Sequence, residues 1–113
     1  MIILDSTLKS LEIVLGTAKT TTDMPFVLGY VDLLSVDQSI SAVGSNDGTS
    51  NGTGVVTILA APAAGHTRQV KFISVQNADT LVKTLTLQYN DNSTERTIVQ
   101  IALAVGDNLI YTD

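Results

Sequence analysis

The sequence predicts an all-β protein: a single-domain antiparallel β-sandwich or jelly-roll-like barrel of about seven or eight short strands, with an extended N-terminal arm. Three observations support this. Val, Ile, Leu and Thr dominate while Trp is absent, and branched β-carbons favour pleated strands over helices. Short apolar runs are separated by clusters of Gly, Asn, Asp and Ser, which form turns. The length of 113 residues fits one domain, which we expect to span 11–113 behind an arm of 1–10.

The N-terminal segment is where helix and strand patterns compete. Four leucines among the first fifteen residues fall at helical spacing, but the run Leu11–Leu15 is rich in β-branched residues and ends at Gly16. We therefore expect an arm with at most one helical turn, followed by a first strand near 11–18.

The run Pro25–Leu34 predicts the second strand. Pro25 suits a first strand position, where its missing N–H costs least, and Gly29 inside the run suggests a bulge. One face would carry Phe26, Leu28 and Tyr30, and the other is apolar enough to be partly covered, with Val27, Val31 and Leu33. A short, weak strand is expected around Ile40.

The segment Gly44–Gly54 is the clearest break in the pattern. It contains only Gly, Ser, Asn, Asp and Thr, so it has nothing to bury that could offset the entropy of ordering. We expect a long exposed loop, which is either mobile or contacts a neighbouring subunit. The residues to which such a contact would be assigned are Asn46, Asp47 and Asn51.

The rest of the chain predicts a rapid succession of strands joined by short turns. The expected strands are Val55–Ala60, Arg68–Gln76, Leu81–Tyr89, Thr94–Leu103 and Leu109–Tyr111. Within Arg68–Gln76 the apolar phase slips between Phe72 and Ile73, which indicates a bulge or a strand covered on both faces. The clusters 77–80 and 90–93 are typical of turns.

Composition and charge argue against several classes of partner. The net charge is −5 and the six Lys and Arg residues are scattered singly, so no basic patch would neutralise phosphates and nucleic acid is not an expected partner. Without cysteine, disulfides and thiolate chemistry are excluded. No run approaches the ~20 apolar residues of a membrane helix, and the N-terminus lacks a basic signal-peptide region. We expect no membrane partner and synthesis in the cytoplasm.

Catalytic and metal sites are not expected either. His66 is the one histidine, and no nucleophile or orienting carboxylate is indicated beside it. The segments 46–48 and 90–92 offer oxygen ligands of the kind calcium prefers, but neither has the spacing of a known calcium loop. The sequence therefore predicts no enzyme activity, no cofactor and no bound metal.

Several stretches resemble small structural proteins of tailed phages and prophages. They are 68–75 (RQVKFISV), 77–80 (NADT), 85–92 (LTLQYNDN), the ending 103–111 (LAVGDNLIY) and the opening 11–15 (LEIVL). These are strand-and-turn patterns rather than a chemical signature. Within that class, the chain is most similar to capsid decoration (cement) proteins in its size and its β-rich content.

The resemblance implies a virion structural protein that binds the major capsid protein on the capsid exterior, stabilises the shell and forms a homo-oligomer, a trimer. The alternative is a tail, neck or fibre-associated structural or receptor-binding protein. The apolar arm would then reach onto the capsid protein or a sister subunit, with β-augmentation as one mode. The arm residues to which this contact is assigned are Ile2, Ile3, Leu4 and Leu8.

Overall fold

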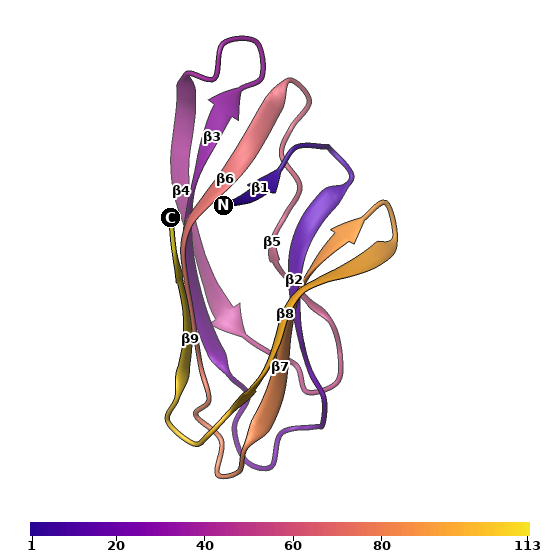
Figure 1. Ribbon diagram of the computed structural model, residues 1–113, viewed down its shortest axis with the longest axis vertical. Helices are drawn as coiled ribbons and strands as arrows, with labels where there is room; N and C mark the ends of the chain where they lie inside the picture. The colour runs from indigo at the N-terminus through magenta and orange to yellow at the C-terminus, as the bar shows by residue number, and fades with distance from the viewer.

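The computed structural model describes residues 1–113 as nine strands in two antiparallel sheets (Figure 1). The strands are β1 Ile2–Leu4, β2 Lys9–Leu15, β3 Pro25–Leu34, β4 Ile40–Thr49, β5 Val56–Leu59, β6 His66–Gln76, β7 Lys83–Asp91, β8 Thr94–Leu103 and β9 Asn108–Thr112. No strand pairs with a strand of the other sheet. The expected all-β fold is confirmed, and of its two forms the sandwich is the one observed.

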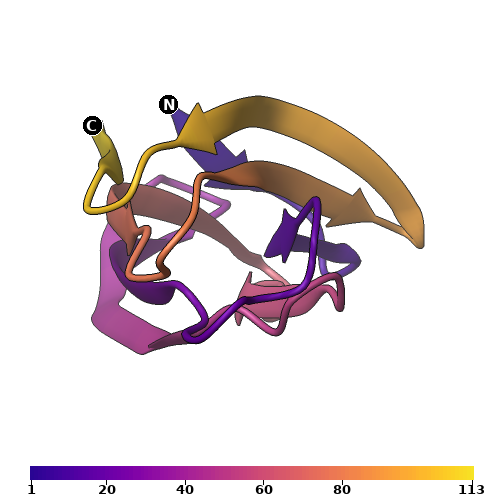
Figure 2. The ribbon, with the colours of Figure 1, turned by 90° about the horizontal axis from the view of Figure 1, so that it is seen from below.

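The five-stranded sheet has the order β1-β6-β3-β4, and β9 also pairs with β6. Strand β1 pairs with Arg68–Val70 and β9 with Phe72–Gln76, so both lie along the same edge of β6. The Ile2 N–H donates to the Tyr111 hydroxyl at 2.9 Å, and the two termini lie on the same side of the molecule (Figure 2). The four-stranded sheet has the order β5-β2-β7-β8.

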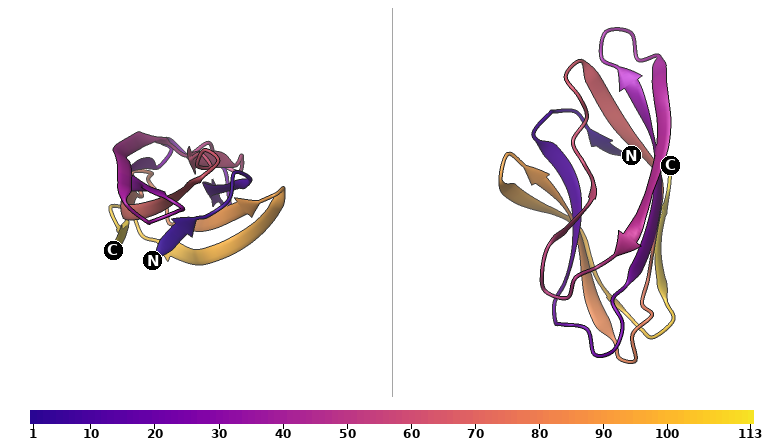
Figure 3. Two further views of the ribbon diagram at one scale, coloured as in Figure 1. Left: turned by 90° about the horizontal axis from the view of Figure 1, so that it is seen from above. Right: turned by 180° about the vertical axis from the view of Figure 1, so that it is seen from behind.

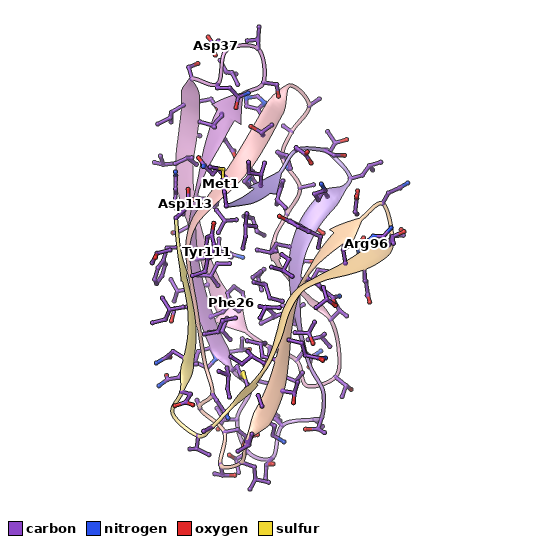
Figure 4. All side chains as sticks on the ribbon, viewed as in Figure 1. Met1, Phe26, Asp37, Arg96, Tyr111 and Asp113 are labelled. Carbon is purple, nitrogen blue, oxygen red and sulfur yellow. The ribbon has the colours of Figure 1, made fainter.

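The core lies between the two sheets and takes one face of each. Alternation along the strands turns every second residue inward, and sixteen buried apolar residues form one cluster. Figure 4 places Phe26 between the sheets and Arg96 at the distant tip of the β7–β8 hairpin. The main inward residues are Leu11, Ile13 and Leu15 of β2, Phe26 and Leu28 of β3, Val70, Ile73 and Val75 of β6, and Leu85 and Leu87 of β7.

A bulge in the β3–β6 pair confirms the predicted irregularity. Gly29 lies opposite Phe72, but the next residue, Tyr30, lies opposite Val70, which leaves Lys71 as the extra residue of β6. The bulge reverses the facing of the residues around it. Val70 is therefore buried while Phe72 is turned outward and is 38% exposed.

The loop expected over 44–54 is largely wrong, because residues 40–49 form strand β4. Nine of its ten residues pair with Pro25–Leu33 of β3, with Ser41 in a bulge, so backbone hydrogen bonds hold a segment that has little to bury. The small residues fit beneath large ones of β3: a Cβ at Gly44 would lie 2.6 Å from the Tyr30 ring, and one at Gly48 would lie 3.1 Å from that of Phe26. The structure has nine strands where seven or eight were expected. Strand β4 is longer than the short strand expected around Ile40, and β1 is an additional strand.

The end of the sandwich where the β2–β3 and β6–β7 loops meet is closed by one carboxylate. Asp79 is 2% exposed and accepts backbone N–H bonds from Thr20 at 2.7 Å, Thr21 at 2.9 Å and Thr80 at 2.8 Å. The Lys83 ammonium lies 3.7 Å away. These donors, the Thr20 N–H first, favour the charged carboxylate and hold the pKa of Asp79 well below its ordinary value of 3.8.

Replacing this carboxylate should lower the stability of the fold in a pH-dependent way. A depressed pKa contributes stability above the unfolded-state pKa and loses it as pH falls through the folded-state value. We expect Asp79→Asn to lower the urea midpoint at neutral pH and to show a smaller further loss than the original protein between about pH 5 and pH 2. Urea unfolding at a series of pH values measures both, with the exposed Asp47→Asn as control at neutral pH. Parallel pH profiles for Asp79→Asn and the original chain would contradict this role.

Candidate interaction surface

The structure assembles no catalytic constellation around its polar residues. The His66 ring Nδ1 lies 3.1 Å from the carbonyl oxygen of Ala64, two residues away. A neighbouring carboxylate, that of Asp32, accepts hydrogen bonds from Arg68 at 2.7 and 2.9 Å. The Arg68 guanidinium holds the pKa of Asp32 below its ordinary value and stacks 4.4 Å from the Tyr30 ring centre. These groups tie β3 to β6.

Two kinds of feature are absent from the described chain. No group of three or more His, Asp or Glu side chains is placed where it could hold a metal ion. The structure has no helix with the length and apolarity needed to cross a membrane.

The outer face of the four-stranded sheet is polar and internally bonded. Glu12 and Gln88 lie opposite each other on β2 and β7 and are only 5% and 4% exposed. The Glu12 carboxylate accepts hydrogen bonds from Gln88 Nε2 and Asn90 Nδ2, both at 3.4 Å. Thr86 accepts one from Gln100 Nε2 at 3.2 Å. Such side chains are satisfied by one another and leave little apolar surface for a partner.

The outer face of the five-stranded sheet is instead apolar. The strand register sets Val27 beside Ser74 and Ile110 in one row, and Val31 beside Val43 in another. Val43 is 73% exposed, Ile110 60% and Val27 49%. We call this surface the apolar face; its members are Ile3, Val27, Val31, Leu33, Val43, Phe72 and Ile110. Polar residues such as Ser74 and Gln69 lie between some members, but an exposed group of large apolar side chains on one sheet face is typical of an interaction site.

Few charges interrupt the apolar face. The Asp113 carboxylate binds the Lys71 ammonium at 3.1 Å and the Gln69 amide at 3.1 Å, so the two opposite charges neutralise each other. The outward positions beside Val27 and Phe72 hold the small residues Gly29, Ser45 and Ser74. The apolar face is therefore recessed at its middle.

A shallow hollow lies at the end of this face that is next to β1. It has a volume of about 410 Å³ and is lined by Met1, Ile3, Asp5, Leu33, Gln38, Thr67 and Gln69. The one carboxylate in the lining, Asp5, is engaged by the Lys9 ammonium at 2.8 Å, and this hydrogen bond lowers the pKa of Asp5. The hollow therefore continues the apolar face, and its one lining carboxylate is already paired.

The N-terminal residues do not form the free arm that the sequence suggested. Ile2 and Leu4 are 5% and 0% exposed because β1 pairs with β6 and turns both side chains into the core. Their contact with a partner stays a prediction, and it would require β1 to leave the core. Ile3 points outward into the apolar face, and Leu8 is exposed in the β1–β2 turn, so contact with a partner through these two stays a prediction.

The three residues expected on a contact loop are separated by the fold. Asn46 lies on the inward side of β4 and donates to the Ile58 carbonyl at 2.7 Å, so it braces β4 against β5. Asp47 points outward from β4 at the border of the apolar face. Asn51 lies beyond the strand in a bridge with Gly54. Only Asp47 and Asn51 are free to face a neighbour.

Sequence reasoning missed the apolar face as a unit. A signal was present, since Val27, Val31 and Leu33 make the second phase of β3 apolar. Phe72 and Ile110 join them only through the bulge and the β6–β9 register. The face therefore depends on pairings that sequence patterns do not contain.

Comparison with protein-family models, with curated proteins and with solved structures finds no match for this chain.

The packing of β1 predicts different effects for two leucines that were expected to act alike. Leu4→Ala should lower the free energy of unfolding by about 2–5 kcal/mol, because it opens a cavity in the core. Leu8→Ala should change it by less than about 0.5 kcal/mol, because the side chain is 58% exposed. Urea unfolding of both variants measures the difference. Equal, small effects would show that β1 is detached from the core in solution.

Proposed function

We propose that this chain is a virion structural protein that binds the exterior of a phage capsid as a decoration protein, with the major capsid protein as its partner. The observation that carries the proposal is the apolar face, a broad surface without a catalytic or metal-binding group. The resemblance of the strand-and-turn motifs to phage structural proteins supports the identity of the partner. The chain acts by binding, and its chemistry is that of an interface.

The size of the face suits a stable protein–protein contact. Four strands at a spacing of about 4.8 Å, each about ten residues long at ~3.3 Å per residue, span roughly 600 Å². A standard interface buries about 800 Å² on each partner. The whole outer face of the sheet therefore supplies about three quarters of that area, and the loops and the hollow beside it would supply the rest.

The composition of the face fits the pattern of known interfaces. Their buried centres are depleted in charge and enriched in aromatic and aliphatic groups, and their rims are polar. Phe72, Val27 and Ile110 form such a centre, while Asp47 and the Lys71–Asp113 pair lie at its border. The polar outer face of the four-stranded sheet would point to solvent. The chain then binds the shell on one side and leaves a hydrophilic side outward.

The fold suits a part that must resist force. Packaged DNA presses a capsid shell outward, and a rigid clamp seated over subunit junctions adds binding free energy that opposes their separation. Nine strands around one continuous core deform little, because a well-packed interior has low compressibility. Repetition by the symmetry of the shell multiplies the effect of each modest contact.

A polar substitution at the centre of the face should remove capsid binding without unfolding the chain. We expect Val27→Asn to weaken co-sedimentation with capsids at least about tenfold, since altering a hot-spot residue at the centre of an interface costs about 2 kcal/mol or more and 1.4 kcal/mol is tenfold. Val82→Asn is the matched control: Val82 is 60% exposed and Val27 49%, but Val82 lies in the β6–β7 loop outside the face. Equal binding by the two variants would exclude this face as the contact.

The number of copies in each virion separates this proposal from the tail, neck or fibre alternative. A protein spread over the shell is present in hundreds of copies, whereas a tail or neck component is present in a handful. Quantitative mass spectrometry of purified virions measures this ratio. A handful of copies would overturn the decoration proposal and favour the alternative.

A further inference from the structure

The free edge of the five-stranded sheet is a second surface with a defined chemistry. Strand β4 pairs only with β3, and its ten residues are exposed along almost their whole length. Seen from behind in Figure 3, β4 lies nearest the viewer with no strand in front of it. Its unpaired N–H and C=O groups can bind only another extended backbone.

The phase of the β3–β4 ladder shows which residues present these groups. The Ser50 N–H donates to the Met24 carbonyl at 2.9 Å, and directly opposite pairs in an antiparallel ladder alternate between bonded and non-bonded. The next pair, Pro25 with Thr49, is thus non-bonded, as the missing proline N–H requires. Counting on, the residues of β4 whose backbone groups point to the free edge are Val43, Ser45, Asp47 and Thr49.

The other edge strands carry more of the features that prevent pairing than β4 does. Strand β5 has only four residues, and the opposite edge of the five-stranded sheet is divided between the short β1 and β9. Strand β8 has Glu95 and Arg96 and an internal bulge. In contrast, β4 has no Pro and no Lys, one charge at Asp47, and an irregularity only at its start. Natural sheets protect long edges by these devices.

We infer that β4 pairs with β4 of a second copy of this chain, antiparallel, across a two-fold axis perpendicular to the sheet. Such an axis keeps the residues of each face on the same side, so two five-stranded sheets join into one. The register with Ser45 opposite itself lies within the regular part of the strand, beyond the bulge at Ser41, and sets Val43 opposite Asp47. Every one of these pairs joins edge-facing residues, so their N–H and C=O groups meet in bonded pairs.

The side chains of β4 allow this pairing. Ser45 meets Ser45 on the axis, and the inward residues nearest the axis are Gly44 and Asn46. The two Asp47 carboxylates are offset by four residues, roughly 13 Å along the strands, which is beyond the screening length of about 8 Å at physiological ionic strength. The lone charge of the edge therefore does not oppose self-association.

The dimer extends the apolar face without depending on what that face binds. Outward residues of both copies, Val43 among them, would form one surface of about twice the area. The inference concerns the free protein in solution, so it stands or falls separately from capsid binding, which Val27→Asn tests. It also differs from the three-fold oligomer that the resemblance implies.

Cysteine cross-linking tests the register directly, because the chain has no cysteine of its own. Bonded antiparallel pairs have Cα atoms about 5.5 Å apart, within the range of about 4.4–6.8 Å that a disulfide spans. Ser45→Cys should therefore give a covalent dimer under mild oxidation, at twice the 11.9 kDa of one chain. The control, Ser41→Cys, is on the same strand, but its two copies would be roughly 26 Å apart and should remain uncross-linked.

A proline at the same position tests the hydrogen bonds. Ser45→Pro removes an edge-facing N–H and leaves the β3 ladder intact, so we expect a folded chain, by circular dichroism, whose sedimentation mass falls by half. A wild-type chain that sediments as a monomer or a trimer overturns the inference, and so does equal cross-linking of the two cysteine variants. A monomer that loses capsid binding on Ser45→Pro would assign the edge to a strand of the capsid protein and overturn self-pairing.

Discussion

One core and two sheets impose the constraint on which the rest of this structure depends, since each sheet can turn only one of its faces toward the other. Sixteen buried apolar side chains fill the space between them, and burial of this kind is the main favourable term in folding. What remains outside is two sheet faces and their edges. The two outer faces differ in polarity and the edges differ in how far they are protected from pairing. These differences decide which surfaces can bind a partner.

The polar groups of the chain are largely committed to closing the sandwich. Asp79 binds the backbone of the β2–β3 loop, and Asp23 accepts hydrogen bonds from the Ser50 hydroxyl at 3.0 Å and the Gly52 N–H at 2.8 Å. The Gly52 N–H is the main cause that lowers the pKa of Asp23. Carboxylates bound in this way stabilise loops through hydrogen bonds to their charged form. They are therefore occupied by the fold, and the surfaces that remain for function are the apolar face and the β4 edge.

The parts of the fold that the sequence predicted are those where local chemistry and tertiary packing agree. Strands β3 and β8 have the expected bounds because an apolar run ends in turn residues on both sides. The β7–β8 hairpin turns at Asn92 and Ser93, both with positive φ, as polar turn residues favour. A bulge within Arg68–Gln76 was predictable because burial reverses across it, but it lies at Lys71 and not between Phe72 and Ile73.

The parts that it did not predict depend on partners distant in the chain. Nothing local distinguishes the Gly- and Ser-rich β4 from a loop, because the ladder to β3 and the ring of Tyr30 over Gly44 supply its order. Strand β1 has three residues, which is too short to show an alternation of apolar and polar residues. Its apolar side chains are buried only because β1 pairs with β6, and the sequence does not contain that pairing. The candidate surface has the same origin: one phase of β3 was readable, but Ile110 joins it only through β6.

The apolar face and the β4 edge share residues of strand β4. Beyond the bulge, the odd-numbered residues of β4 from Val43 to Thr49 both point their side chains to the outer face and present their backbone groups to the free edge. Val43 therefore belongs to both surfaces, and any strand added at this edge must continue the face. A strand added at the β4 edge would widen the five-stranded sheet and continue its apolar outer face, while the four-stranded sheet remains on the other side of the core. This geometry favours a protein that covers an extended partner over one that encloses a small ligand.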